Sequence, residues 1–165
     1  MKVYGVTGWK NSGKTTLVER LVTEITGRGL SVSTIKHAHH AFDVDQPGKD
    51  SHRHRRAGAS QVLVSSSSRW ALMTENRGRP EPELGALIGQ LAPVDLVLVE
   101  GFKRDRHPKI EARRAATAQD LIARGDPTIE AVATDAPIEG LPVPAFDLDD
   151  VPGIADFILG RVGLR

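Results

Sequence analysis

Residues 8–15 read Gly8-Trp9-Lys10-Asn11-Ser12-Gly13-Lys14-Thr15, and this stretch decides how the rest of the chain is interpreted. It fits the pattern G-x-x-x-x-G-K-[ST], in which a glycine-rich loop wraps a phosphate with its backbone N–H groups. Glycines keep side chains out of the way, and the following helix adds the positive end of its dipole. An ordinary glycine turn of similar sequence is the alternative. The motif predicts a nucleotide-binding P-loop.

Two side chains of this loop have distinct chemical tasks in such a site. Lys14 is expected to reach the β- and γ-phosphates, and the hydroxyl of Thr15 is expected to bind Mg²⁺. The other positions expected to contact the nucleotide are Gly8, Lys10, Asn11, Ser12, Gly13 and Thr16.

The residues around the loop have the pattern of a strand, a helix and a second strand. Residues 2–7 and 30–36 read as strands. Between them apolar residues recur at helical spacing, and Gly27 and Gly29 supply the left-handed geometry that ends a helix. Two strands joined through a helix predict a parallel sheet covered by helices.

The rest of the chain is expected to extend this architecture. Residues 61–64 and 70–73 read as strands whose short connection predicts an antiparallel hairpin. Thr117 is expected to cap a short helix, with Asp120 in the capping-box position. Helices are expected at 50–57, 84–91 and 151–162, and further strands at 94–99, 109–113 and 128–133. The fold class is therefore α/β: a three-layer P-loop NTPase sandwich with a mainly parallel sheet and an added antiparallel hairpin, in a single nucleotide-binding domain over residues 1–165.

Length and composition are those of one ordinary globular domain. The chain has 165 residues, of which 39% are hydrophobic and 26% charged, and its formal net charge is +1. This balance argues against nucleic-acid binding. No apolar run approaches the ~20 residues that cross a bilayer, and the first residues lack a signal peptide. The absence of cysteine excludes disulfides and thiolate metal sites, so we expect a cytoplasmic protein without a membrane partner.

A second acidic group is needed for the metal of a P-loop site, and Glu100 is the candidate. It follows the apolar residues 94–99, where a carboxylate is costly to bury without a partner. Mg²⁺ or its water shell is the partner that we expect, and Gly101 would let the backbone approach the γ-phosphate. The alternative is a strand-end glutamate that simply reaches solvent.

Five of the six histidines lie between residues 37 and 54, among lysines, arginines and aspartates. Three interpretations stay open for this segment. Neutral imidazoles at His-x-His-His spacing permit a transition-metal site. The same side chains would serve a loop that binds phosphate, at the sheet edge where ligands of α/β folds lie. The third interpretation is a solvated loop of biased composition. Among its acids, Asp50 is the candidate for the Mg²⁺ shell.

A second basic segment follows Glu100 and contains Lys103, Arg104, Arg106, His107 and Lys109. Because it leaves the same edge of the sheet, these side chains are candidates for holding a second anionic substrate or an anionic partner surface. A charged surface loop without such a role is the alternative.

Five motifs stand out when the segments are taken in order. They are residues 8–16, Lys36-His37-Ala38-His39-His40, residues 43–51, the basic run to residues 57–59, and Val99-Glu100-Gly101-Phe102-Lys103. Together they resemble a known family, the molybdopterin-guanine dinucleotide biosynthesis adaptor proteins, or MobB family, over most of residues 1–135. The resemblance implies a GTP-binding homodimer of the P-loop class that uses Mg²⁺. Members of the family assist the guanylyltransferase MobA in attaching GMP to molybdopterin, and their GTPase activity is weak at most.

Two positions depart from what the resemblance implies. Some relatives carry a lysine directly after the first glycine of the loop, and this lysine acts across the dimer. Here Trp9 occupies that position, so no such role is assigned to Lys10. The chain also lacks an Asn-Lys-x-Asp motif for guanine. Asp135, at the end of an expected strand, is the candidate acceptor for guanine N–H groups, and a turn aspartate before Pro137 is the alternative.

Two classes of function compete at this point. The leading hypothesis is an adaptor that binds GTP·Mg²⁺ and a second phosphorylated ligand or partner, and that hydrolyses GTP slowly at best. The alternative is an enzyme, either a P-loop phosphotransferase for a small molecule or an active GTPase. Such an enzyme needs a positioned base, and no acid in the sequence stands out in that role.

The expected hairpin bears on assembly. A lone two-stranded hairpin is marginal in water, so Val62, Val64, Trp70 and Leu72 need cover. They pack on their own domain or pair with a second copy, because an uncovered edge invites aggregation. The family resemblance favours a dimer with the hairpin in its interface.

Overall fold

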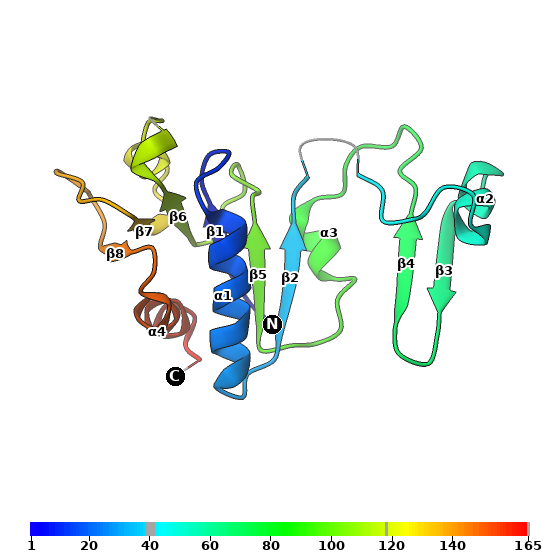
Figure 1. Cartoon of the computed structure of the whole chain (residues 1–165), viewed down its shortest axis with the longest axis horizontal. Helices are drawn as coiled ribbons and strands as arrows, with labels where there is room; N and C mark the ends of the chain where they lie inside the picture. Colours follow the sequence, from blue (N-terminus) through cyan, green and yellow to red (C-terminus); the bar gives the residue numbers. More distant parts are fainter. Residues whose placement is uncertain (39–41, 118, 165) are drawn as a thin grey trace. The chain divides into compact units, whose positions relative to one another are not determined.

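The computed structural model describes residues 1–38, 42–117 and 119–164. A six-stranded sheet lies at its centre, in the order β2-β5-β1-β6-β7-β8 (Figure 1). All neighbouring strands in this sheet are parallel, which confirms the predicted α/β class. The strands are β1 (Lys2–Thr7), β2 (Val32–Lys36), β5 (Leu96–Glu100), β6 (Lys109–Arg113), β7 (Ile129–Thr134) and β8 (Ala145–Asp147).

Helices cover both faces of the sheet and make it the middle of three layers. On one face α1 (Lys14–Gly27) and α4 (Val151–Val162) share a core with the central strands (Figure 1). On the other face α3 (Leu84–Ile88) packs against β5. Every residue of β5 is buried, as expected for a parallel strand covered on both sides. No helix in the described ranges is long and apolar enough to span a membrane.

Some irregular segments differ from the sequence-based expectation. α3 ends at Ile88 instead of residue 91, and β8 was not expected. The helix expected to begin at Thr117 is wrong, because Ala115–Thr117 is a single 3-10 turn that ends there. The Thr117 hydroxyl donates to the carbonyl oxygen of Arg114 at 2.7 Å instead of accepting a helical N–H.

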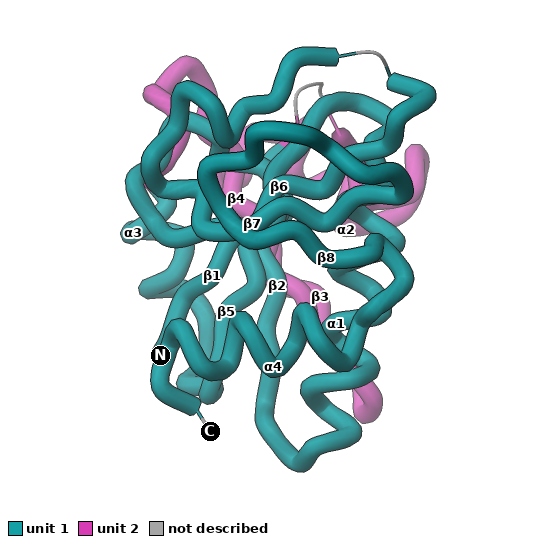
Figure 2. The backbone as a smooth tube through the Cα atoms, turned by 90° about the vertical axis from the view of Figure 1, so that its left-hand side faces the viewer, with its two compact units in different colours: residues 1–37, 84–165 teal, residues 38–83 magenta. Residues whose placement is uncertain are grey.

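The chain divides into two compact units (Figure 2). Unit 1 comprises residues 1–37 and 84–165 and contains the six-stranded sheet. Unit 2 comprises residues 38–83 and is inserted between β2 and α3. A single domain over residues 1–165 stays a prediction.

Unit 2 is built on an antiparallel hairpin, as predicted. Its strands are β3 (Gln61–Ser65) and β4 (Trp70–Thr74), and α2 (Asp50–Arg56) precedes them. The side chain of Arg55 connects three acidic residues of the unit. Its guanidinium donates to the carboxylates of Asp43, Asp45 and Glu75 at 2.8, 3.1 and 2.8 Å.

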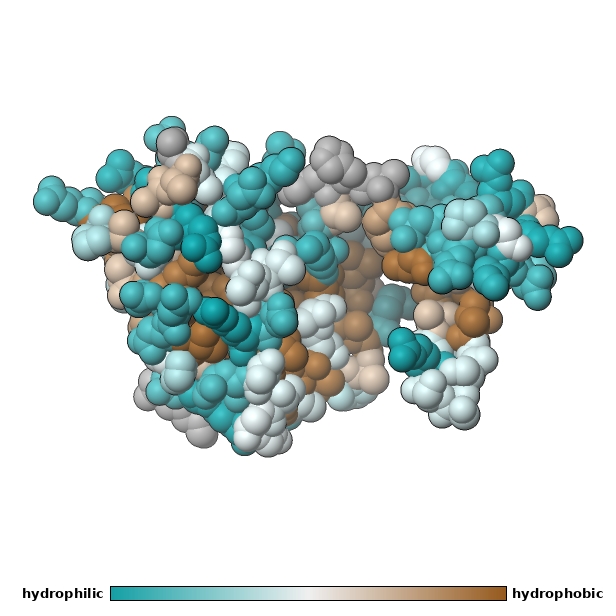
Figure 3. Space-filling model, viewed as in Figure 1, coloured by the Kyte–Doolittle hydropathy of each residue, from teal (hydrophilic) through white to brown (hydrophobic). Residues whose placement is uncertain are grey.

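The two faces of the hairpin differ in exposure. Leu63 pairs with Leu72 and Ser65 with Trp70, so these side chains share one face, while Val62 belongs to the other. Leu63, Trp70 and Leu72 are 59%, 66% and 43% exposed, whereas Val62 is 8% exposed. Figure 3 shows hydrophobic surface over this unit. Val62 is therefore covered within its own chain, which is one of the two outcomes expected for it, whereas Val64 on the same face is 45% exposed. Leu63, which the sequence pattern did not single out, is exposed beside Trp70 and Leu72.

Candidate nucleotide-binding site

The glycine-rich loop joins β1 to α1 at the edge where the parallel strands end (Figure 1). Gly8 has a φ of 144°, and a Cβ there would lie 2.3 Å from the carbonyl oxygen of Ala112, so only glycine fits. Gly13 is the N-cap of α1, with a φ of 92° and no side-chain hydrogen bond to the first N–H groups. These N–H groups are thus left for a ligand, and an anion suits them best.

Thr15 and Glu100 meet at this edge from distant parts of the chain. The Thr15 hydroxyl donates to Oε1 of Glu100 at 2.9 Å. Glu100 is the last residue of β5 and is only 8% exposed. A hydroxyl and a carboxylate oxygen side by side are ligands that Mg²⁺ accepts together with phosphate oxygens and water. The residues present therefore fit the expected Mg²⁺.

Lys36 joins this pair. It ends β2 in register with Glu100, and its Nζ lies 3.2 Å from Glu100 Oε1. The same ammonium group donates to the Thr15 hydroxyl oxygen at 3.3 Å. Sequence reasoning placed Lys36 only within a basic segment. The adjacency of β2 and β5, which both end at this edge, brings it to the Thr15 hydroxyl and the Glu100 carboxylate.

Trp9 contacts two more lysines, Lys14 of the loop and Lys103 of the segment after β5. Lys14 Nζ donates to the carbonyl oxygen of Trp9, and Lys103 Nζ lies 4.0 Å from the centre of the Trp9 ring. Burial lowers the pKa of Lys14, and the charges of Lys103 and Lys36 lower it further, against the opposite effect of Glu100. Burial also lowers the pKa of Lys103. These lysines repel one another, and a triphosphate would relieve that repulsion.

The other predicted contact residues of the loop, and Gly101, differ in exposure and packing. Lys10, Asn11 and Thr16 are exposed, whereas Ser12 is 2% exposed, and among the described residues its buried hydroxyl has no hydrogen-bond partner. Gly101 has a φ of 92°, and a Cβ there would lie 3.0 Å from the Cβ of His37. Its N–H donates to the carbonyl oxygen of Val6 at 3.1 Å. The structure thus gives this glycine a packing role, and its place at the γ-phosphate stays a prediction.

Two candidate acids are engaged elsewhere. Oδ1 of Asp135 accepts a hydrogen bond from the backbone N–H of Ala115 at 2.8 Å, and Oδ2 lies 3.7 Å from Arg114 Nη1. Asp50 belongs to unit 2, where it begins α2 and lies 3.8 Å from Arg53. The guanine-binding role of Asp135 and the metal-shell role of Asp50 stay predictions.

Two of the five basic side chains after Glu100 have buried polar atoms, whereas Arg104 and Arg106 are exposed, and their anion-binding role stays a prediction. Lys109 is fully buried, and its Nζ donates to Oγ1 of Thr128 at 2.6 Å. The ring nitrogens of His107 are buried, and burial lowers its pKa to about 4, so this ring is neutral at physiological pH. The expectation is wrong for these two residues, because the segment turns back to begin β6. Lys103 is the member that approaches Lys14.

The histidine-rich segment is described in part. His37 packs its ring against Phe102 with ring centres 4.7 Å apart. His39 and His40 lie outside the described residues. Within the described ranges, no three His, Asp or Glu side chains are grouped so that they could hold a metal ion. The three interpretations of this segment stay open.

Comparisons with known proteins agree with this geometry. The family model described as molybdopterin guanine dinucleotide synthesis protein B (MobB) matches residues 3–135. The chain is 42% identical over 156 residues to the molybdopterin-guanine dinucleotide biosynthesis adapter protein of Escherichia coli (strain K12), covering 92% of this chain and 87% of the relative. It is 45% identical over 157 residues to the protein of the same name from Haemophilus influenzae, covering 93% and 85%.

Solved structures agree as well. The crystal structure of a MobB protein homolog from Bacillus stearothermophilus has a TM-score of 0.72 and 32% identity, and each chain is covered completely. The structure of Bacillus subtilis MobB has a TM-score of 0.70 and 25% identity, with 98% of both chains covered.

The sheet order and the glycine-rich loop at the end of β1 define an α/β protein with the P-loop NTPase fold. The chain belongs to the MobB family, as the resemblance of its motifs predicts.

Replacing Glu100 with glutamine is expected to weaken Mg²⁺-dependent GTP binding by roughly tenfold or more and to leave Mg²⁺-free binding almost unchanged. Glutamine keeps the size and the hydrogen bond from Thr15, but it removes the charge that a metal shell requires. Calorimetric titrations in Mg²⁺ and in EDTA measure both affinities, with the exposed Glu139→Gln as control. Equal losses in both titrations would assign Glu100 a structural role instead.

Proposed function

We propose that the protein binds GTP with Mg²⁺ at its P-loop and acts as an adapter in molybdopterin guanine dinucleotide biosynthesis. The observation that carries nucleotide binding is the convergence of Lys14, Lys36 and Lys103 beside the hydrogen-bonded pair Thr15–Glu100. Support for the pathway comes from relatives named as adapters of this biosynthesis, which align with most of the chain.

Each group has one task in this proposal. The backbone of residues 8–15 wraps the phosphates, and Lys14 and Lys103 neutralise their charge. Thr15 and Glu100 hold Mg²⁺, which neutralises and orients the phosphates when it is bound. Lys36, 3.2 Å from Glu100, adds a further positive charge at the same edge of the sheet.

A presenting role for GTP fits the acids of the site better than rapid hydrolysis. Fast phosphoryl transfer needs a group that positions the attacking water or hydroxyl. Glu100 is engaged by Thr15 and Lys36. Glu111, the next buried acid, accepts two backbone N–H groups. Hydrolysis is therefore weak at most, and bound GTP is offered to the guanylyltransferase MobA together with molybdopterin.

The apolar face of the hairpin supports assembly into a homodimer. Leu63, Trp70 and Leu72 lie on one side of β3–β4 and are largely exposed. Apolar side chains grouped on a two-stranded hairpin need a partner surface for stability in water. A second copy of the chain provides one of equal chemistry, related by a two-fold axis.

Replacing Lys14 with alanine is expected to lower the affinity for GTP by roughly 10- to 100-fold or more while the fold is kept. Among the described residues its ammonium group donates one hydrogen bond, to the carbonyl oxygen of Trp9, so little stability is lost. Calorimetry with GTP and circular-dichroism melting measure the two effects. Lys2→Ala, at an exposed lysine of the same unit, is the control. A folded Lys14→Ala protein with wild-type affinity would contradict the assignment of the loop.

The paired substitution Leu63→Lys with Leu72→Lys is expected to give a monomer that still binds GTP, because it places two charges on the exposed face of the hairpin. Sedimentation measures the assembly state. Ser67→Lys with Ser68→Lys adds the same charge at the hairpin tip and should remain dimeric. A wild-type monomer at micromolar concentration would refute the dimer, and a dimeric double-leucine variant would move the interface elsewhere.

A further inference from the structure

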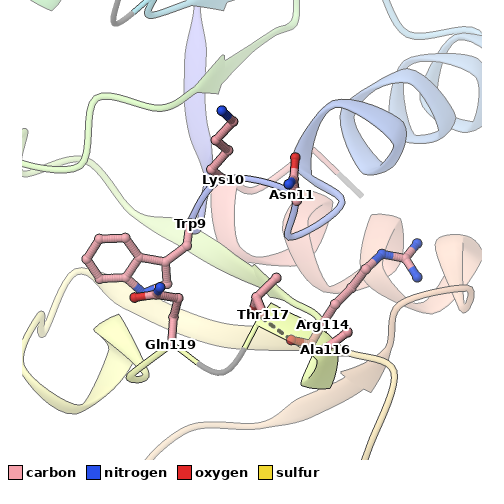
Figure 4. A pocket seen from close by; sticks show the side chains of 7 residues that line it. All are labelled: Trp9, Lys10, Asn11, Arg114, Ala116, Thr117 and Gln119. Atoms are coloured by element: carbon pink, nitrogen blue, oxygen red, sulfur yellow. Dashed lines mark hydrogen bonds between the residues drawn. The ribbon is translucent and has the colours of Figure 1, made fainter.

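A cavity of about 490 Å³ opens beside the P-loop (Figure 4). Trp9, Lys10 and Asn11 of the loop line one side, and Arg114, Thr117 and Gln119 of the segment after β6 line the other. Its volume falls within the ~300–1,000 Å³ typical of small-molecule sites. Because Lys10 and Asn11 belong to both the loop and the cavity, an occupant would lie next to the bound phosphates.

Several polar side chains at the cavity are not engaged by other described residues. Among the described residues, the side chains of Lys10, Asn11 and Gln119 make no hydrogen bond or ion pair. Arg114 lies 3.7 Å from Asp135, its one ionic neighbour in the part of the chain that the structure describes. Two amides that can each donate and accept, together with two cations, are therefore available to a ligand.

The wall after β6 is fixed by hydrogen bonds although it has little regular structure. Glu111, with no exposed surface, accepts the backbone N–H groups of Ile122 and Ala123 at 3.1 and 2.8 Å. Burial raises the pKa of this carboxyl group, which reflects the cost of desolvating its charge. Glu111 thus anchors the 3-10 turn Ile122–Arg124, which follows the lining residues Arg114, Thr117 and Gln119 in the chain.

Two further contacts hold the same wall. Oδ1 of Asp135 accepts the N–H of Ala115 at 2.8 Å, at the beginning of the segment. The indole N–H of Trp9 donates to the carbonyl oxygen of Asp120 at 2.8 Å and ties the segment to the loop. The anchored backbone and the unengaged side chains together have the character of a preorganised binding site.

We propose that this cavity is a second ligand site that takes a pterin carrying an anionic group while the nucleotide occupies the P-loop. This inference rests on the proposed function. A pterin is planar and presents an edge of alternating donors and acceptors, which Asn11 and Gln119 can match. Guanine has the same 2-amino-4-oxo edge, so the nucleotide's own base is the other source of this chemistry.

Charge favours the separate pterin. The phosphates of a nucleotide meet Lys14, Lys36 and Lys103, and its nucleoside part is neutral. Lys10 and Arg114 line the cavity in addition to these lysines. Beside a neutral nucleoside, Lys10 would have no counter-charge and Arg114 would have only Asp135, at 3.7 Å, whereas an anionic pterin supplies one to both cations.

Binding of carboxypterin, a fluorescent pterin that bears a carboxylate, tests the proposal. Fluorescence anisotropy of the probe is followed with the full chain, with and without a saturating β,γ-imido analogue of GTP and Mg²⁺. We expect saturable binding that persists in the presence of the analogue. Displacement of the probe by the analogue would overturn the proposal, because the cavity would then hold the nucleotide's base. Lack of probe binding would overturn it as well.

Variants locate the probe. Gln119→Ala and Arg114→Ala should each weaken carboxypterin binding at least about fivefold. The matched controls Gln90→Ala and Arg124→Ala, at exposed residues outside the cavity, should not. Gln119→Ala should bind the GTP analogue as the wild type does. Equal probe affinity in all four variants would place the pterin elsewhere and contradict the proposal. If the analogue fails to bind at all, the proposed function fails, while the variants still test the cavity.

Discussion

A buried carboxylate at the end of a parallel strand is the constraint on which the site depends. Glu100 closes β5, a strand covered on both faces, and it cannot carry its charge there without positive groups or donors around it. The parallel register supplies them, because β2 delivers Lys36 and the loop after β1 delivers Thr15 to the same point. The fold thus assembles a hydroxyl, a carboxylate and an ammonium group from three separate segments. A metal–phosphate complex is the ligand that we propose for this combination.

Trp9 connects the glycine-rich loop to three other groups. Its carbonyl oxygen accepts Lys14, its ring lies under Lys103, and its indole N–H reaches Asp120. One residue therefore links the lysines of the phosphate site to the wall of the neighbouring cavity. If both proposals hold, the nucleotide and a second ligand would share a boundary, which is the geometry that an adapter needs to present two ligands together.

The sequence predicted the features that depend on local pattern. It missed those that depend on where the chain re-enters the sheet and on which face of a strand is buried. The P-loop, Glu100 and the parallel sheet follow from glycine spacing and apolar runs. In β3 and β4, apolar residues occupy both faces, so alternation could not tell exposed Leu63 from buried Val62. Lys109 reads as a basic surface residue, but β6 begins there and buries it. The segment after β6 is held by the side chains of Glu111 on β6, Trp9 in the glycine-rich loop and Asp135 after β7. No short-range signal in the sequence encodes such contacts.

Calorimetric titration of the wild-type protein with GTP and Mg²⁺, in buffers of different ionisation enthalpy from neutral to alkaline pH, tests the central claim most directly. Burial and mutual repulsion lower the pKa of Lys14, so phosphate binding should raise it again. The account predicts one GTP per chain, dependence on Mg²⁺, and proton uptake on binding that grows at alkaline pH, where free Lys14 begins to lose its proton. Affinity should fall over the same pH range. Binding without Mg²⁺ dependence and without proton uptake, or no binding at all, would contradict the account.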